Sequence, residues 1–131
     1  MLVDTNILID IVEDDPEWSD WSIAQLRSQS QVYELAINPI IYAELSVTFS
    51  RLETLDKVID RLGLKFVEIP RAALFLAAKA FVQYRQARDV KSNVLPDFFV
   101  GAHAAVASTS LLTRDPRRYR TYFPGVRLVT P

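Results

Sequence analysis

The chain has 131 residues, enough for a sizeable hydrophobic core, and we expect a single domain over residues 1–131. Half of the residues are hydrophobic and 24% are charged, an ordinary balance for a globular protein. The absence of cysteine excludes disulfides and thiolate metal sites. A single histidine, His103, disfavours a zinc site of the usual histidine type.

The N-terminus does not resemble a signal peptide, because it has no basic leader and Asp4 and Asp10 interrupt its apolar run. No stretch reaches the roughly 18 consecutive apolar residues of a membrane span. We therefore expect a soluble cytoplasmic protein without membrane contact.

The net charge of −1 conceals an uneven distribution along the chain. Residues 1–68 carry 13 acidic and 5 basic side chains, whereas residues 69–131 carry 3 acidic and 10 basic ones. Two of those three late acids are Asp97 and Asp115. The pattern suggests a polyanionic substrate at a metal site within a basic surface, and equally a simple attraction between the two halves.

Short β-like runs alternate with longer helical patterns. In chain order we predict a strand at 1–4, a helix at 17–30, a strand at 33–37, helices at 39–49 and 51–62, a strand at 65–69, a helix at 71–89, a loop at 91–96, a helix at 97–107, a strand at 110–113, a helical turn from 115 and a strand at 126–129. Asn38 and Pro39 are a typical helix start, and Gly63 a typical helix end.

This alternation predicts an α/β fold with a parallel sheet covered on both faces. Ligands of such sheets bind at the carboxyl ends of the strands. Asp4 and Asp115 both follow predicted strands, so we expect them at the same edge of the sheet.

Two further acids lie in apolar surroundings. Asp97 opens a nearly uncharged helix, whose small residues Gly101 and Ala104 would allow a close approach to the sheet. Glu44 lies beside the apolar stripe of its own helix. Each of the four acids has an ordinary explanation, since the three aspartates could cap helices and Glu44 could be exposed. One shared cause is the more economical explanation.

Carboxylates gathered around one point repel each other and raise one another's pKa unless a cation neutralises them. With thiolates excluded and imidazoles scarce, oxygen ligands indicate a hard cation such as Mg²⁺ or Mn²⁺. One ion or a pair of ions fits this number of ligands, and the sequence therefore points to a metal-dependent hydrolase.

Four blocks of the sequence resemble the PIN-domain family, and most of all its VapC-type toxins. They cover nearly the whole chain in the family's order, and they are Val3–Asp10, Ile40–Leu45, Pro96–Ala104 and Leu111–Asp115. The resemblance implies a three-layer α/β/α sandwich with a central parallel sheet. It also implies a Mg²⁺- or Mn²⁺-dependent endoribonuclease that hydrolyses RNA phosphodiester bonds with a metal-activated water.

By the same resemblance, the acidic quartet that would carry catalysis is Asp4, Glu44, Asp97 and Asp115. Asp4, Asp97 and Asp115 are expected as the metal ligands, with Glu44 as the least certain member. Asn6 and Thr113 match polar residues that support the site. The family likeness further implies a homodimeric toxin of a type II toxin–antitoxin system, held inactive by a cognate antitoxin protein.

The basic and aromatic residues near Asp115 have competing interpretations. Arg114 and Arg117 could contact RNA phosphates, or simply form a solvated face. For the aromatic residues Tyr119, Tyr122 and Phe123 we favour a role in the core over base stacking. His103 is expected to be structural, because its position turns it away from Asp97.

Two other functions share the predicted α/β class. A phosphotransfer domain, of the receiver or aspartate-phosphatase kind, also places aspartates at strand ends. The phosphatase would need an Asp-x-Asp motif, which Asp4-Thr5-Asn6 does not provide, and a receiver would need a late lysine that residues 111–131 lack. A catalytically inactive binding module with the same fold is the other alternative, and the intact acidic quartet argues against it.

Overall fold

Five parallel strands and the helices between them build the protein, in a computed structural model that describes residues 1–87 and 94–131. The strands are β1 (Leu2–Val3), β2 (Ala36–Ile37), β3 (Lys65–Phe66), β4 (Leu111–Leu112) and β5 (Leu128–Val129). The helices are α1 (Thr5–Val12), α2 (Ser19–Ser30), α3 (Pro39–Ser46), α4 (Leu52–Arg61), α5 (Arg71–Ala87), α6 (Leu95–Val106) and α7 (Arg117–Tyr122). The end of the helix predicted at 71–89, which corresponds to α5, and the start of the loop predicted at 91–96 fall on residues 88–93, outside the described residues.

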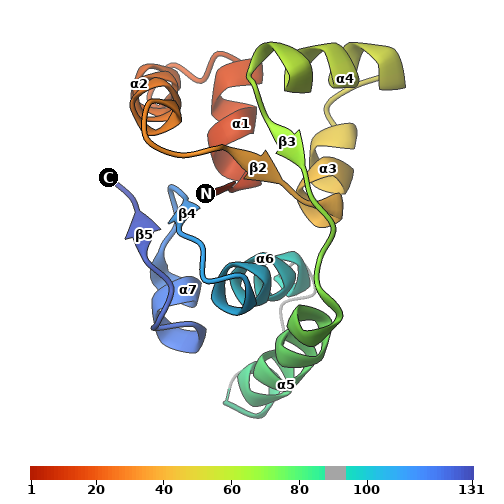
Figure 1. Cartoon of the computed structure of the whole chain (residues 1–131), viewed down its shortest axis with the longest axis vertical. Coiled ribbons are helices and arrows are strands. Elements are labelled where there is room, and N and C mark those ends of the chain that lie inside the picture. The colour runs from red at the N-terminus through yellow and green to blue at the C-terminus, as the bar shows by residue number, and fades with distance from the viewer. Residues whose placement is uncertain (88–93) are drawn as a thin grey trace.

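The strand order is β3-β2-β1-β4-β5, and every neighbouring pair is parallel. The first strand of the chain is therefore the central one, with Leu2 in register with Ala36 on one side and Leu111 on the other. In Figure 1, α1, α2 and α4 lie above the sheet and α5 and α6 below it. This arrangement confirms the predicted α/β/α layering with a central parallel sheet.

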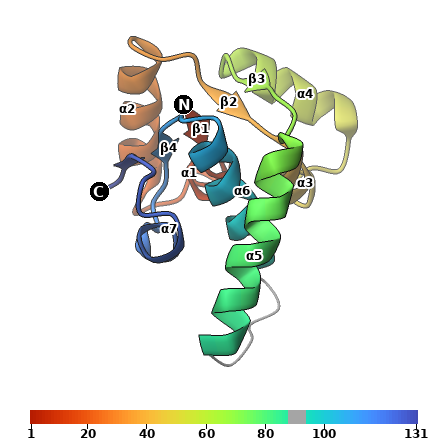
Figure 2. The ribbon, with the colours of Figure 1, turned by 60° about the horizontal axis from the view of Figure 1, so that its bottom comes forward.

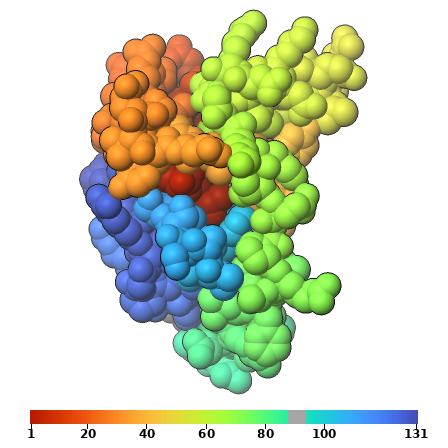
Figure 3. All heavy atoms as spheres, viewed as in Figure 1, coloured from red at the N-terminus to blue at the C-terminus, as the bar shows by residue number. Residues whose placement is uncertain are grey.

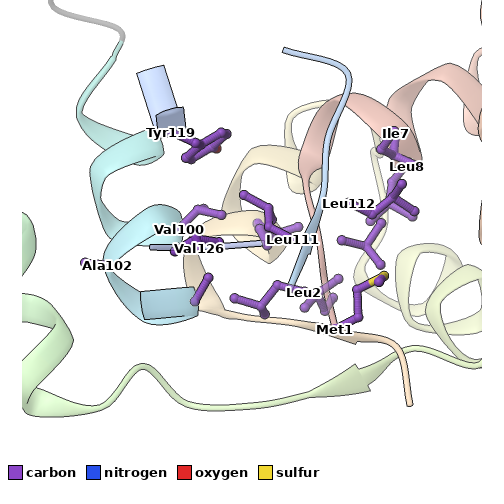
Figure 4. Packing of buried hydrophobic residues seen from close by; sticks show 14 of the residues in the cluster. Met1, Leu2, Ile7, Leu8, Val100, Ala102, Leu111, Leu112, Tyr119 and Val126 are labelled. Carbon is purple, nitrogen blue, oxygen red and sulfur yellow. The ribbon is translucent and has the colours of Figure 1, made fainter. Parts of the chain in front are cut away.

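Both faces of the sheet are buried at strands β1 and β4, as the continuous apolar runs of parallel strands require. Leu111 and Leu112 are fully buried and point to opposite faces. Figure 4 shows Leu111 on the side of Val100 from α6, and Leu112 on the side of Ile7 and Leu8 from α1. In Figure 3, the red atoms of the first residues are visible between the orange segment before β2 and the light-blue end of α6.

The sequence analysis missed the helix that follows the first strand. Asp4 ends β1 and at once caps α1, because its Oδ1 accepts a hydrogen bond of 2.8 Å from the Thr5 backbone N–H. The predicted helix start at Asn38 and Pro39 and the predicted helix end at Gly63 are confirmed. Asn38 caps α3 through a 3.0 Å bond from the Ile41 N–H, and Gly63 has a φ of +69° after α4.

Helix α6 begins two residues earlier than predicted, so Asp97 lies in its first turn and not at its cap. Gly101, one turn further on, makes room for the ring of Phe123 just after α7, rather than for the sheet. Figure 2 shows α6 between α5 and α7. Within the described residues, no helix has both the length and the apolar character needed to span a membrane.

We expect Gly101→Ala to destabilise the fold, although alanine normally favours a helix interior. An added Cβ would lie 2.6 Å from Cε2 of Phe123, which is itself buried. Overpacking of this kind costs about 1–3 kcal/mol of unfolding free energy, measurable by urea titration. Gly125→Ala is the control, since no atom lies within 4 Å of its added Cβ. Equal stability of the two variants would contradict the packing argument.

Candidate active site

The carboxylate of Asp4 lies at the carboxyl end of the central strand and is 5% exposed. Its Oδ2 accepts hydrogen bonds from Thr113 Oγ1 at 2.8 Å and from the Tyr119 hydroxyl at 2.9 Å. Asn6 Nδ2 lies 3.4 Å from the same oxygen. Burial raises the pKa of Asp4, and the hydrogen bonds from Thr113, Tyr119 and Thr5 oppose that rise.

Thr5 joins Asp4 to the half-buried Glu44. Its backbone N–H binds Asp4, while its hydroxyl donates a 2.6 Å hydrogen bond to Oε1 of Glu44 on α3. Burial raises the pKa of Glu44, and repulsion from Asp97 adds to the rise. Glu44 therefore belongs to the same electrostatic group as the aspartates, through a neighbour that the sequence analysis did not consider.

Asp97 reaches this group from the first turn of α6 and forms an ion pair with Arg118 of α7. Burial raises the pKa of Asp97 to about 6, with further repulsion from Asp4 and Asp115. Arg118 lowers this pKa but does not cancel the rise. The pairing of Arg118 with Asp97 was not predicted, because the arginines near Asp115 were ranked only by their distance from it along the chain.

Asp115 lies at the open side of the group, with a side chain that is 56% exposed. Its backbone N–H donates a 3.2 Å bond to Thr113 Oγ1, which in turn binds Asp4. Arg117, which is more exposed still, lies 3.5 Å from Oδ1 of Asp115. Thr113 therefore links the end of β4 to Asp4 at the end of β1. Asn6 also contacts Thr113, with its Nδ2 3.3 Å from Oγ1.

The structure brings the four predicted acids to one edge of the sheet. Their side chains do not surround a common point as the ligands of a bound ion would. Within residues 1–87 and 94–131, no three acidic or histidine side chains stand close enough together to hold an ion as they are. The donor set nevertheless fits a hard divalent cation. It consists of carboxylate oxygens, and burial and mutual repulsion raise the pKa values of Asp4, Glu44 and Asp97, an effect that a cation would relieve.

A second aspartate–arginine pair lies next to this group. Asp10 of α1 is 2% exposed and accepts hydrogen bonds from Arg114 Nε at 2.7 Å and Nη2 at 2.8 Å. Ser22 of α2 donates to the same carboxylate at 2.8 Å, and the guanidinium carbon of Arg114 lies 5.2 Å from the Trp18 ring centre. Arg114 is thus held on α1 and α2, and its predicted contact with RNA stays a prediction.

Asp10 was not recognised as a functional or structural acid from the sequence. The signal was present, because Asp10 stands between Ile9 and Ile11 in an apolar helix, just as Glu44 stands among apolar neighbours. A buried carboxylate in that position needs a cation or several donors. The structure supplies Arg114 and Ser22.

The predictions for Tyr119, Phe123 and His103 can be compared with the burial and contacts of these side chains. Tyr119 and Phe123 are buried in the core, as favoured, but the Tyr119 hydroxyl also binds Asp4, which sequence reasoning missed. His103 is structural as expected. It is buried, and its Nδ1 lies 3.1 Å from Nδ2 of Asn38.

A groove of about 510 Å³ lies elsewhere, and Tyr33, Ser108, Ser110 and Arg127 are among the residues that line it. These residues precede β2, β4 and β5 and therefore lie at the edge of the sheet opposite Asp4. This groove does not contain the acidic group, which is identified by the chemistry of its side chains.

We expect Arg114→Ala to destabilise the protein by about 2–4 kcal/mol, because it leaves the Asp10 carboxylate buried without its cation. Arg117→Ala removes an equal charge from an exposed pair and should change the unfolding free energy little. Urea titrations of both variants measure the difference. Similar losses would show that Arg114 contributes no more than a surface charge.

The stability of the metal-free protein should depend on pH through Asp97. Its folded pKa of about 6 exceeds the ordinary value of 3.8, so the folded state binds this proton more tightly than the unfolded state. The resulting stabilisation is complete below 3.8 and is lost as the pH rises through 6. Urea titrations across this range should show a steeper fall for the wild type than for Asp97→Asn, and equal slopes would contradict the assignment.

Three comparisons place the chain among known proteins. Residues 1–124 match the model of the PIN domain. The VapBC2 complex from Rickettsia felis bound to a promoter DNA fragment contains a similar fold, with a TM-score of 0.74, 19% identity and coverage of 98% of this chain and 96% of that one. FitAcB from Neisseria gonorrhoeae gives a TM-score of 0.68 at 16% identity, covering 97% of this chain and 94% of that one.

A toxin–antitoxin complex from Klebsiella pneumoniae is similar at 27% identity, with a TM-score of 0.63 and coverage of 99% of this chain and 96% of that one. The comparison with curated proteins found no match. The family model spans nearly the whole chain, and the parallel sheet agrees with it. The chain therefore belongs to the PIN domain family.

Proposed function

We propose that this protein is a metal-dependent endoribonuclease and the toxin of a type II toxin–antitoxin pair. The observation that supports the proposal most strongly is the group of Asp4, Glu44 and Asp97, whose pKa values are all raised at one edge of the sheet. Gathering acids with raised pKa values does not stabilise the fold. Carboxylates with perturbed pKa values concentrate at functional sites.

Asp4, Asp97 and Asp115 are the side chains that would hold Mg²⁺ or Mn²⁺. Thr113 and Asn6 orient the Asp4 carboxylate, and Thr5 orients Glu44. A bound divalent ion supplies an activated water and stabilises the leaving oxygen of a phosphodiester. Glu44 would act from the neighbouring helix, as a water-mediated ligand or as a proton acceptor.

Positive charge around this edge supports a polyanionic substrate. Arg117 is exposed beside Asp115, and Arg120 and Arg85 are exposed on α7 and α5. Such side chains contact phosphates without selecting a sequence. Of the two arginines predicted to bind RNA, Arg117 is exposed and pairs with the exposed Asp115, whereas Arg114 is bound to the buried Asp10.

The proposed partners are a second copy of the chain and a cognate antitoxin. Large apolar side chains are exposed just after α3 and on α5, including Val47 at 89% and Phe75 at 67%. Apolar surface of this kind marks protein interfaces. The solved complexes with a similar fold are titled VapBC, FitAB and toxin–antitoxin assemblies.

We expect the purified protein to cleave RNA in Mn²⁺ or Mg²⁺ and to be inactive in EDTA. Asp97→Asn keeps the shape of the side chain but removes its charge, and should lower the cleavage rate at least about 100-fold. Glu53→Gln, an exposed acid of α4, is the matched control and should retain full activity. Circular dichroism checks that each variant is folded.

Undiminished cleavage by folded Asp97→Asn would exclude the proposed site. A folded wild-type protein that cleaves no RNA with either metal would instead favour the inactive binding module. Expression of the wild type and of Asp97→Asn in cells distinguishes a toxin from an enzyme without that role, since only an active toxin should arrest growth.

A further inference from the structure

The ion pair between Arg118 and Asp97 links α7 to the first turn of α6. Arg118 Nη1 donates to Oδ2 of Asp97, and the two side chains are 26% and 31% exposed. Asp97 is one of the three acids proposed to hold the metal. An arginine of the chain itself is therefore bound to an oxygen that a metal ion would need.

Arg118 is held at this place by packing as well as by charge. Its guanidinium carbon lies 5.8 Å from the ring centre of Tyr84 on α5. Tyr84 packs in turn on Phe98 and on Tyr122, with ring centres 5.5 and 5.9 Å apart. The arginine therefore lies in an aromatic setting that restricts it to the neighbourhood of Asp97.

The other acids of the site are compensated differently. Asp4 accepts hydrogen bonds from neutral donors, namely Thr5, Thr113 and Tyr119. Glu44 accepts one from the hydroxyl of Thr5. Arg118 is thus the cation paired with the inner part of the group, in the portion of the chain that the structure describes.

We propose that Arg118 is the resident counter-cation of Asp97, which a divalent metal ion must displace, so that Arg118 sets the metal affinity of the site. This proposal rests on the proposed function. Displacement is an exchange of ionic partners and involves no covalent step. Removal of Arg118 should leave Asp97 available and strengthen metal binding, because the ion no longer competes with a positive charge.

A purely structural role for the ion pair makes the opposite expectation. If Arg118 only holds α6 and α7 together, its removal loosens Asp97 and weakens metal binding. Isothermal titration with Mn²⁺ alone separates the two roles without any measurement of cleavage. The exchange is worth about two- to fivefold in dissociation constant, given the partial exposure of the pair.

The titration compares the wild type with Arg118→Gln, Arg118→Lys and Arg120→Gln. Arg118→Gln should bind Mn²⁺ about two- to fivefold more tightly than the wild type. Arg118→Lys keeps the charge and should bind much like the wild type, and it serves as the folded comparison if the glutamine variant is unstable. Arg120→Gln removes the same charge from an exposed position of α7 and should have a much smaller effect.

A double mutant provides the decisive test of the partner. In an Asp97→Asn background the gain from Arg118→Gln should disappear, because the contested oxygen no longer carries the charge. Equal or weaker Mn²⁺ binding by Arg118→Gln, relative to Arg120→Gln, would overturn the proposal. With wild-type Mn²⁺ binding and RNA cleavage intact, that result would leave the proposed function standing. A protein that binds no Mn²⁺ in any variant would contradict both.

Discussion

The burial of the Asp4 carboxylate is the constraint on which the rest of the site depends. A carboxylate that is 5% exposed must be satisfied by donors close to it, and the chain provides them from segments far apart in sequence. Thr5 lies next to it, and Thr113 and Tyr119 come from more than 100 residues further on. The same carboxylate caps α1. The hydrogen bonds that satisfy Asp4 therefore begin the helix after β1 and also bring Thr113 and Tyr119 to the site.

Residues 113–119 supply most of what the acids require. Thr113 and Tyr119 donate to Asp4, Arg114 neutralises Asp10, and Arg118 pairs with Asp97. Both cations and both hydroxyls therefore come from β4's end and the short helix α7. These contacts balance charge between the acidic first half and the basic second half of the chain at this edge of the sheet. Attraction between the two halves and the candidate site are therefore the same set of contacts.

The sequence predicted the fold and grouped the four acids with Asn6 and Thr113, but it did not predict the other partners of the acids. Alternating patterns predicted the parallel sheet, and strand ends predicted that Asp4 and the segment before Asp115 meet. Helix α1 was missed because it begins directly after the first strand, with only Asp4 between the two elements. Asp10, Arg118 and Tyr119 were missed because their roles depend on contacts between residues at least 21 positions apart, which local patterns do not encode.

The two aspartate–arginine pairs show why similar chemistry has two outcomes here. Asp10 is almost fully buried, is bound by two nitrogens of Arg114 and by Ser22, and has no open side from which an ion could approach. Asp97 makes one contact with Arg118, is about a third exposed, and faces the repulsion of Asp4 and Asp115. A pair with every donor in place is stable as it is. A pair whose acid is still repelled by neighbouring carboxylates favours a stronger cation. The pair of Asp10 and Arg114 therefore stabilises the fold, whereas Asp97 can exchange Arg118 for a metal ion.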